Sequence, residues 1–387
     1  MRILIVLTYF QPYKSGLTVY AVRQARALVR LGHHVTVLTS QYDPSLPLEE
    51  LDHGVRIIRL PVAFRLSKGV IMPGIPFKAY KLIGESDIIN LHAPQFDSAL
   101  IALLSKLRRK PVVMTYHCDL KMPAGLINKL AGWAAKGANR ISAENANVIV
   151  HNTRDFAENS EFLKRYLYKL EMIRPPIVVD SVSQKEIKAF RNKYQISQDQ
   201  IVIGMVARMS AEKGVEYLVE AMFQVIRSIP NARVVFVGES QNVPGESAYR
   251  EKVLPMIAAL GSHWSFLGVV SESEKAVFFH LCDVLVLPSI NSTESFGMVQ
   301  VEALTCGTPV VATDLPGVRQ PVKETGWGQI VPAENAKALG EAILQVLNEG
   351  ILMAPNAISS LTEKYSPEAI GQAYDDLYHR LLRQHGS

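Results

Sequence analysis

The residues best suited to chemistry follow the apolar segment 283–287, where the chain reads PSINSTESFGMVQVEA. Glu294 and Glu302 stand eight residues apart in this stretch, the first on a loop and the second in an expected helix. A continuous helix would separate them by about 12 Å, at about 1.5 Å per residue. Because a carboxylate accepts two hydrogen bonds from neighbouring hydroxyls, the pair suits a ligand with two polyhydroxyl groups, such as a hexose and a ribose.

Less specific interpretations of this stretch remain open. Glu294 could be a carboxylate favoured by a helix amino terminus, and Glu302 could lie on a solvated helix face. Apolar neighbours count against full exposure of Glu302, namely Val299, Val301, Ala303 and Leu304. Amides at a helix start lack intrahelical partners, so those of Phe296, Gly297 and Met298 would face a diphosphate or a sugar.

A second cluster follows the apolar segment 201–207 and includes the sequence ARMSAEKG. Arg208 and Lys213 place two cations on a tight loop between an expected strand and an expected helix. Fixed cations and helix-end amides together can bind a diphosphate. A solvated loop in which Lys213 pairs with Glu212 is an equally open interpretation of this motif alone.

Histidines provide a third group of candidates. His117 follows the apolar segment 111–115, at the sheet edge where α/β proteins bind ligands, so we interpret it as functional. His92 occupies a similar edge and is a weaker candidate for acceptor binding, and Asp119 could contact acceptor or sugar. Cys118 is rejected as a nucleophile because adjacent residues diverge in an extended segment and no orienting partner is identifiable. Three more histidines are expected on the surface or in loops: His33, His34 and His53.

The elements that hold these residues alternate between short apolar segments and amphipathic ones. In the first half the expected strands are 2–7, 34–39, 55–60, 87–91, 111–115 and 147–150, with helices at 17–31, 95–108 and 123–143. In the second half the expected strands are 201–207, 233–237, 264–268, 283–287 and 309–312, with helices at 215–228, 248–260, 272–281, 296–306 and 336–348. Such alternation is typical of parallel sheets covered on both faces. The sequence therefore predicts an α/β protein with two doubly wound, Rossmann-like domains.

The domain boundary is expected at the Pro-Pro segment 174–177, which gives domains over 1–177 and 178–365. The tail 366–387 is expected to cross back to the first domain as a helix with one apolar stripe, formed by Ile370, Ala373, Leu377 and Leu381. Residues 1–177 carry 24 basic and 13 acidic side chains, and the remainder carry 17 and 23, so the net charges are +11 and −6. Two such domains bind ligands in a central cleft, and the basic one could face nucleic acid or phospholipid.

Composition excludes several classes of protein. The 387 residues are 48% hydrophobic and 20% charged, unlike disordered, collagen-like or disulfide-scaffold chains. Three widely spaced cysteines predict neither a metal cluster nor a secreted disulfide framework. No apolar stretch approaches the ~18–20 residues that span a bilayer, and the first residues lack a signal-peptide pattern. A cytoplasmic protein without a metal site is expected.

Three motifs together resemble the retaining glycosyltransferases of family 4 (glycosyl transferases group 1), which have the GT-B fold. These are the Ala-Arg-x-x-x-Glu-Lys-Gly loop 207–214, the Glu-x7-Glu pair, and ALTCGTPVVATD over 303–314. The resemblance spans nearly the whole chain, because the first half supplies a glycine after its first strand and TYHCD at 115–119. A Glu-x7-Glu pair alone is a weak signal, whereas the pair with the cationic loop at the expected distance upstream is a strong one.

The resemblance implies roles for the matching residues of the second half. Arg208 and Lys213 would hold the donor diphosphate and stabilise the leaving nucleoside diphosphate. Glu302 would bind the ribose. Glu294, with the backbone of Phe296, Gly297 and Met298, would hold the hydroxyls of the donor sugar. The base would contact the segment Gly268-Val269-Val270.

The resemblance implies that domain 1–177 binds the acceptor, on variable loops such as 41–53 and 62–77, and that domain 178–365 binds the nucleotide sugar. In the first half, it places His117 beside the donor sugar near the reaction centre. Gly16 would let the backbone approach the diphosphate. Here the chain departs from the family, because Ser15-Gly16-Leu17 stands where many relatives carry paired glycines, so the phosphate loop is expected to be less permissive. Ala207 stands where glycine is common, which should be benign.

The implied reaction moves a hexose to a saccharide or lipid-linked acceptor. UDP-glucose or a related UDP-hexose is the expected donor by family frequency, with GDP-mannose as the alternative. The chain has no Asp-x-Asp motif, the metal–diphosphate clamp of the other large glycosyltransferase architecture, so activity without a divalent ion is expected. Retention would come from front-face attack, with the leaving diphosphate oxygen taking the acceptor proton. A covalent route through Glu294 is less favoured, because that side chain should be engaged with sugar hydroxyls.

Other classes of function fit the sequence less well. A dinucleotide oxidoreductase is disfavoured because no Gly-x-Gly-x-x-Gly follows the first strand. No motif supports nucleic-acid binding, and a non-catalytic sugar- or nucleotide-binding protein stands as the alternative of a different class. A nucleotide-sugar epimerase or a phosphorylase of the same fold also stays open, although neither predicts the Glu-x7-Glu pair so well. Peripheral association with an anionic membrane is a further hypothesis, since the basic region 121–143 also carries Leu126, Ile127, Leu130 and Trp133. A core-facing stripe is the competing interpretation of those residues.

Overall fold

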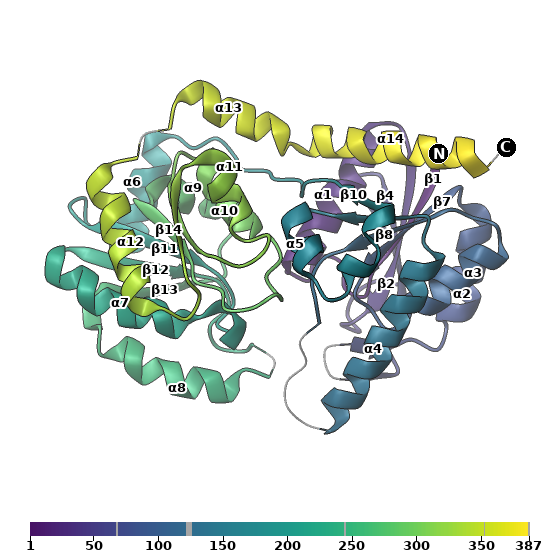
Figure 1. Cartoon of the computed structure of the whole chain (residues 1–387), viewed down its shortest axis with the longest axis horizontal. Helices are drawn as coiled ribbons and strands as arrows, with labels where there is room; N and C mark the ends of the chain where they lie inside the picture. The colour runs from purple at the N-terminus through teal and green to yellow at the C-terminus, as the bar shows by residue number, and fades with distance from the viewer. Residues whose placement is uncertain (67–68, 121–125, 244, 352, 386–387) are drawn as a thin grey trace. The chain divides into compact units, whose positions relative to one another are not determined.

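The computed structural model describes residues 1–66, 69–120, 126–243, 245–351 and 353–385, with the backbone alone at 66 and 126–131. The chain forms two compact units (Figure 1). Unit 1 consists of Met1–Pro176 and Tyr365–Ser387, and unit 2 consists of Ile177–Lys364. Both ends of the chain therefore belong to the same unit.

Unit 1 contains an eight-stranded sheet with the strand order β10-β9-β8-β7-β1-β2-β4-β3. The strands are β1 (Arg2–Val6), β2 (His34–Gln41), β3 (Glu49–Asp52), β4 (Val55–Pro61), β7 (Ile88–Ala93), β8 (Val112–Tyr116), β9 (Val148–His151) and β10 (Leu170–Met172). Neighbouring strands are parallel except at the edge, where β3 pairs antiparallel with β4. A separate hairpin joins β5 (Phe64–Leu66) to β6 (Gly69–Ile71).

The helices of unit 1 are α1 (Gly16–Arg30), α2 (Ile75–Glu85), α3 (Ser98–Leu107), α4 (Leu126–Asn145), α5 (Arg154–Asn159) and α14 (Pro367–His385). Short 3-10 turns lie at η1 (Leu163–Arg165) and η2 (Leu167–Lys169). Helix α1 begins where it does because the Ser15 side chain accepts a hydrogen bond from the Thr18 amide. Helix α14 packs on α1, and its buried face adds Tyr374 and Tyr378 to the predicted stripe, while Ala373 is only half-buried.

Unit 2 contains a six-stranded, parallel sheet with the order β13-β12-β11-β14-β15-β16. The strands are β11 (Ile201–Val206), β12 (Ala232–Val237), β13 (Trp264–Gly268), β14 (Val284–Leu287), β15 (Val310–Thr313) and β16 (Gly328–Val331). The helices are α6 (Gln184–Lys193), α7 (Val215–Ser228), α8 (Ser247–Ala258), α9 (Glu272–Leu281), α10 (Met298–Thr305), α11 (Gln320–Thr325), α12 (Ala336–Glu349) and α13 (Pro355–Lys364). Short 3-10 turns lie at η3 (Ala211–Lys213) and η4 (Gly261–His263).

The predicted strands and helices of both halves are present, and the structure adds elements that the pattern missed. The missed elements are β3, β5, β6, β10, β16, α2, α5, α6, α11 and α13. The helix expected at 296–306 is shorter, Met298–Thr305, and the one expected at 123–143 is Leu126–Asn145, with 123–125 outside the described residues. His33 lies in the loop between α1 and β2, as expected, although its side chain is only 8% exposed and its Nε2 lies 2.8 Å from Asp375 Oδ1 of α14.

Among the helices of the described residues, none is both long enough and apolar enough to cross a bilayer.

Candidate functional site

Ligands of α/β sheets bind beyond the carboxyl ends of the strands, where the strand order reverses. In unit 2 this switch point lies between β11 and β14, because the chain continues from β11 to β12 on one side and later adds β14 on the other. The loops that leave β11 and β14 carry Arg208, Lys213 and Glu294. The sequence-predicted cations and the first glutamate therefore lie at the switch point of this sheet.

The backbone joins these two loops directly. Ile290 N donates a hydrogen bond of 3.1 Å to Glu212 O. Gly214 has a φ of +62°, and a Cβ atom there would lie 2.2 Å from the carbonyl oxygen of Pro288. Glycine alone combines this left-handed backbone with so close an approach. The position of the cationic loop is thus fixed against the loop that carries Glu294.

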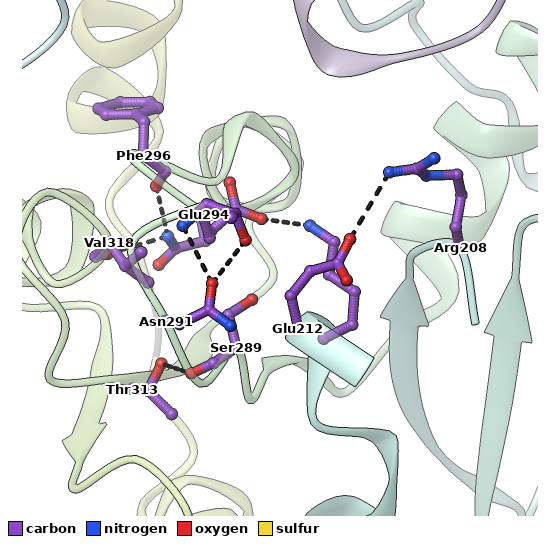
Figure 2. Close-up of polar contacts among 11 residues, drawn as sticks. Arg208, Glu212, Ser289, Asn291, Glu294, Phe296, Thr313 and Val318 are labelled. Carbon is purple, nitrogen blue, oxygen red and sulfur yellow. Dashed lines mark hydrogen bonds and ion pairs between the residues drawn. The ribbon is translucent and has the colours of Figure 1, made fainter. Parts of the chain in front are cut away.

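The charged side chains pair across the same contact. Lys213 Nζ lies 2.5 Å from Glu294 Oε2, with the two side chains 20% and 16% exposed. Arg208 Nη2 lies 3.6 Å from Glu212 Oε1, and the arginine side chain is 42% exposed. Figure 2 shows the Glu294 carboxylate on one side of the turn that carries Glu212 and the Arg208 guanidinium on the other. The alternative in which Lys213 pairs with its neighbour Glu212 is wrong, because Lys213 pairs with Glu294.

Hydrogen bonds within the loop hold Glu294 in place. Asn291 Oδ1 accepts hydrogen bonds from Thr293, at 3.1 Å from its amide and 2.6 Å from its hydroxyl. Glu294 N donates to Asn291 O at 3.1 Å. Thr313 of β15 donates to Ser289 O at 2.7 Å (Figure 2). The loop is therefore a rigid support for the carboxylate, which is what ligand orientation requires.

The start of α10 differs from the expectation. The helix begins at Met298, and the preceding Gly297 has a φ of +75°. Gln300 Nε2 donates to Phe296 O at 2.9 Å and so closes the turn before the helix (Figure 2). Since Glu294 precedes this turn, the distance predicted for a continuous helix does not apply to the glutamate pair.

Glu302 lies inside α10 and is 2% exposed, which excludes a solvated helix face. Its Oε2 atom lies 3.4 Å from Lys275 Nζ of α9. Lys275 also pairs with Glu272 at 2.9 Å. Sequence reasoning missed Lys275, because it precedes Glu302 by 27 residues and resembles any lysine on a solvated helix.

Two buried hydroxyls at the switch point were also missed. Ser210 and Ser289 are 1% and 0% exposed, and their Oγ atoms have no hydrogen-bond partner among the described residues. Ser210 precedes η3 and Ser289 follows β14. Leaving such a group unpaired costs about 1–3 kcal/mol, so a polar ligand that reaches these hydroxyls would gain from pairing them.

The residues expected to contact a base lie at the carboxyl end of the edge strand β13. Val269 is 55% exposed and Val270 is 8% exposed. Gly268 before them has a φ of +71°, which turns the chain away from the strand. An exposed valine at the same edge as the cationic loop is compatible with stacking against a base, and that role stays a prediction.

His117 and Gly16 belong to unit 1. His117 Nε2 lies 2.8 Å from His92 Nδ1, and the rings stack with centroids 5.1 Å apart. Burial lowers the pKa of His117 well below its usual value and that of His92 to about 3, so both imidazoles are neutral at neutral pH. The ring of Tyr20 meets His117 edge-on at 5.0 Å. Gly16 is the exposed first residue of α1.

The other polar residues beside His117 have structural partners. Asp119 accepts hydrogen bonds from Tyr116 Oη at 3.0 Å and from Ser160 Oγ at 2.7 Å. Cys118 is a half-buried thiol that is not part of a disulfide. His151 donates from Nδ1 to Tyr116 O at 2.7 Å. The carboxylate of Asp119 thus holds the segment after β8 to the segment after α5.

The architecture matches that of a solved enzyme fold. The structure of HepE from Anabaena in complex with UDP-glucose is similar with a TM-score of 0.78 at 20% identity, over 98% of this chain and 100% of that one. Together with the two doubly wound units, this likeness defines the class: the chain has the GT-B fold of glycosyltransferases.

Family models then place the chain within that class. The model described as glycosyl transferases group 1 matches residues 186–363, and the glycosyl transferase 4-like domain matches 15–175. The chain belongs to the group 1, family 4 glycosyltransferases. Its relatives include an alpha-monoglucosyldiacylglycerol synthase of Acholeplasma laidlawii, 24% identical over 99% of this chain and 98% of the relative. A phosphatidyl-myo-inositol mannosyltransferase of Mycobacterium leprae is 25% identical over 91% of this chain and 89% of the relative.

Proposed function

We propose that this glycosyltransferase moves a hexose from a nucleoside diphosphate hexose to a hydroxyl of a saccharide or lipid-linked acceptor, with retention at the anomeric carbon. UDP-glucose or a related UDP-hexose is the proposed donor. The observation that carries the proposal is the Lys213–Glu294 pair at the switch point of unit 2, with Arg208 on the same loop. The similar structure of HepE in complex with UDP-glucose supports the proposed donor. The name of the similar alpha-monoglucosyldiacylglycerol synthase supports the lipid-linked class of acceptor.

The ion pair suggests how a donor would be held. Without a ligand, Glu294 neutralises Lys213 at 2.5 Å. A diphosphate is a stronger and multiply charged partner for Lys213 and Arg208, so it would release the Glu294 carboxylate to accept hydrogen bonds from the sugar hydroxyls. The buried Glu302 would accept from the ribose, and the unpaired hydroxyls of Ser210 and Ser289 would find partners on the ligand.

The proposed chemistry is a single displacement on the front face of the sugar. The acceptor oxygen forms a bond to the anomeric carbon while the bond from that carbon to the diphosphate oxygen breaks. The acceptor proton passes to the departing diphosphate oxygen. Arg208 and Lys213 stabilise the negative charge that develops on the diphosphate, a contribution of about 2.7–4 kcal/mol for one preorganised donor. We propose that these fixed cations do the work of a metal ion, so no divalent cation is needed.

A donor screen tests this proposal. UDP-glucose, UDP-galactose, UDP-N-acetylglucosamine and GDP-mannose would be compared by thermal shift and by slow hydrolysis, all with EDTA present. A UDP-hexose should raise the melting temperature and be hydrolysed, and NMR of a transfer product should show the donor's α configuration. A response to GDP-mannose alone would support the mannosyltransferase alternative, which the Mycobacterium leprae relative's name favours. Binding without any turnover would favour a non-catalytic binding protein, and no response to any donor would contradict the proposal.

We further propose that unit 1 associates with an anionic membrane on the cytoplasmic side. Helices α2, α3 and α4 contact one another in sequence order (Figure 1). They expose large apolar side chains, with Phe77 81%, Leu107 71% and Trp133 69% exposed. Basic residues lie among them, namely Lys106, Arg108, Arg109, Lys110, Lys136 and Arg140. Apolar groups amid cations suit an anionic bilayer surface.

The exposure of Trp133 disfavours a core-facing position for this residue. The side chains of Leu126, Ile127, Lys129 and Leu130, and all of Lys121, lie outside the described residues. Sedimentation with anionic liposomes at low salt tests the surface. Binding should fall for Trp133→Ser and not for Phe223→Ser, an exposed aromatic of the acidic unit 2. Equal sedimentation with zwitterionic liposomes, or none with anionic ones, would contradict the proposal.

A further inference from the structure

The cationic loop 207–214 of unit 2 rests on a second segment that none of the roles above uses. Strands β11 and β12 are parallel neighbours, so the loops that follow them leave the same edge of the sheet. The first loop carries Arg208 and Lys213, and the second leads from β12 into α8. Met209 N donates a hydrogen bond of 2.8 Å to Glu239 O and so joins the two loops near their starts. The segment that leads into α8 is therefore placed to support the cations.

Two side chains at the start of α8 bind backbone amides on either side of Lys213. Glu246 Oε2 accepts a hydrogen bond of 3.1 Å from Ala211 N, the first amide of η3. Tyr249 Oη accepts one of 3.0 Å from Val215 N, the first amide of α7. The first amides of a helix have no intrahelical partner. The two side chains of α8 thus supply acceptors that the backbone of the loop cannot.

The hydroxyl of Tyr249 is itself held in one orientation. It donates to the carboxylate of Glu216, which is 8% exposed. Lys252 Nζ lies 3.5 Å from Glu216 Oε1 and balances its charge. Burial, together with the neighbouring Glu216 carboxylate, raises the pKa of Tyr249 above its usual value, so the hydroxyl keeps its proton at neutral pH. Because the proton points to Glu216, the oxygen is left to accept from Val215.

These contacts change what the loop offers to an anion. Open amides at a helix start can bind a phosphate, but those of Ala211 and Val215 already donate to side chains of α8. A phosphate that replaced the Glu246 carboxylate at Ala211 would lie beside a like charge, which repels it. The loop therefore offers a diphosphate mainly its cations, and their value depends on how accurately the backbone holds them.

We propose that Glu246 and Tyr249 are positioning residues for the diphosphate site. By binding the amides on either side of Lys213, they hold the loop in the conformation that presents Lys213 and Arg208 to a diphosphate. Neither side chain needs to touch the ligand. The inference rests on the proposed function, because a nucleoside diphosphate donor is what gives the loop a ligand to bind.

Tyr249→Phe tests the contact to Val215, with UDP beside uridine and GDP beside guanosine as probes on the full chain. Calorimetry measures the diphosphates, and saturation-transfer NMR measures the more weakly bound nucleosides. The variant should bind UDP or GDP about fivefold or more weakly, while nucleoside binding stays unchanged because a nucleoside has no phosphate for the loop to hold. Unchanged diphosphate binding, or an equal loss for the nucleosides, would overturn the proposal.

Tyr217→Phe is the matched control for this substitution. Tyr217 lies in the first turn of α7, and its hydroxyl also donates to a glutamate, Glu334 Oε2 at 3.2 Å, but on the exposed surface. The control variant should bind every probe like the parent. A loss of UDP or GDP binding equal to that of Tyr249→Phe would show that any tyrosine hydroxyl of this region has the same effect, and would refute a specific role for Tyr249.

Two substitutions of Glu246 test the contact to Ala211. Glu246→Gln and Glu246→Ala both remove the negative charge, and only the glutamine keeps an oxygen that can accept from the amide. The glutamine variant should therefore bind UDP or GDP at least threefold more tightly than the alanine variant. Equal affinities of the two variants would refute a positioning role for Glu246.

Hydrogen exchange of the Val215 amide reports on the support without any ligand. It should be faster in Tyr249→Phe than in the parent and in Tyr217→Phe, because the amide loses its acceptor. Unchanged exchange would contradict the inference. A parent chain that binds neither UDP nor GDP would contradict the proposed function. A parent that binds one of them with the same affinity as Tyr249→Phe would contradict this inference alone.

Discussion

At the scale of single residues, the site of unit 2 is a set of charges that neutralise one another, and we propose that a bound ligand separates them. Lys213 and Glu294 form a half-buried pair, and Arg208 and Glu212 form a looser one. Half-buried groups keep stronger electrostatic interactions than surface pairs, whose contribution to stability is small. Under the proposed function, we interpret the pairs as binding groups for the donor.

Arg208→Ala should lower the rate of hexose transfer by a factor of about one hundred or more, because a preorganised charge is lost from the departing diphosphate. The measurement is kcat with the identified donor in EDTA. Arg227→Ala, which removes an exposed arginine of α7, is the control and should leave the rate unchanged. A loss below threefold for Arg208→Ala would contradict its role.

Glu294→Gln should strengthen the binding of free nucleoside diphosphate and slow the transfer of hexose. Without the carboxylate, Lys213 is no longer neutralised, so free nucleoside diphosphate should bind a few-fold more tightly. Hexose transfer should fall at least tenfold, because an amide accepts fewer hydrogen bonds from sugar hydroxyls than a carboxylate does. Calorimetry with UDP and GDP measures the nucleotide affinity, and a kinetic assay measures the transfer rate. Weaker binding of every nucleotide would show that Glu294 supports the loop instead.

The buried histidines of unit 1 predict a pH dependence of stability. Burial lowers the pKa of His151 to about 4 and that of His92 to about 3, whereas an unfolded histidine titrates near 6.5. Below pH 6.5 the unfolded chain therefore binds more protons, and the free energy of unfolding falls as the pH falls. Each histidine contributes about 1.4 kcal/mol per pH unit down to its folded pKa.

Urea unfolding between pH 6.5 and 5 measures this slope. His151→Gln, whose amide can still donate to the Tyr116 carbonyl, should reduce the slope by about 1 kcal/mol per pH unit on average over this range, because an unfolded histidine is only half protonated at pH 6.5. His53→Gln is the control, because His53 is exposed on its loop. An unchanged slope in His151→Gln would mean that His151 does not bind its proton on unfolding.

The sequence identified the loops of the unit 2 site but not all of their contacts. Glycine and proline positions, charges and flanking apolar segments predict where Arg208, Lys213 and Glu294 lie along the chain. Which carboxylate pairs with Lys213 depends on two loops 81 residues apart that meet only in the folded sheet. Glu302 was expected to be shielded and is buried, yet its partner Lys275 carries no local signal. Pair assignments of this kind need three-dimensional packing.

At the scale of elements, the predicted strands are those buried in the middle of each sheet. A strand covered on both faces is apolar throughout, so its sequence is distinctive. The missed β3 has the burial pattern of an exposed edge strand, and β16 consists of Gly328–Val331 with mixed exposure. Helix α6 was missed because it is largely polar and buries Phe190, although its Ser183–Glu186 capping box is a signal that could have found it.

A chain of buried hydroxyls joins α14 to the sheet of unit 1. Tyr374 Oη lies 2.8 Å from Tyr20 Oη and 3.0 Å from Thr115 Oγ1, and Asn90 Nδ2 donates to Tyr378 Oη at 2.7 Å. Tyr20 is also the ring that meets His117. The tail helix thus fixes the residue that packs against a predicted catalytic histidine.

Tyr374→Phe should lower the free energy of unfolding by about 1–3 kcal/mol, because two buried hydroxyls lose a partner. Urea denaturation measures the loss. Tyr168→Phe is the matched control, since Tyr168 is 79% exposed, and it should change stability by less than about 0.5 kcal/mol. Equal stability of Tyr374→Phe and the parent would show that the hydroxyl chain contributes nothing.

At the scale of the whole molecule, unit 1 depends on the last residues of the chain. Five side chains of α14 are at most 5% exposed: Ile370, Tyr374, Leu377, Tyr378 and Leu381. At about 1.5–3 kcal/mol each, their burial is comparable with the total stability of a typical domain, about 5–15 kcal/mol. Burial on this scale makes the helix part of the core of unit 1.

A chain that ends at Lys364 should therefore lose the folded state of unit 1 while unit 2 remains folded. Hydrogen exchange measured by mass spectrometry would show rapid exchange in β1 and β7 and slow exchange in β11 and β14. A chain shortened only by 383–387, which the structure shows exposed up to residue 385, is the control and should exchange like the parent. Protection of β1 in the chain that ends at Lys364 would contradict this dependence.

The same arrangement has a consequence for biosynthesis. The surface that receives α14 emerges early from the ribosome, but the helix is translated only after the whole of unit 2. At typical elongation rates of about 5–20 residues per second, the translation of unit 2 alone takes roughly 10–40 s. During that interval the nascent chain presents the uncovered faces of Tyr20 and Ala27, which contact α14 in the folded unit, to the cell, so we expect a requirement for chaperones at this stage of translation.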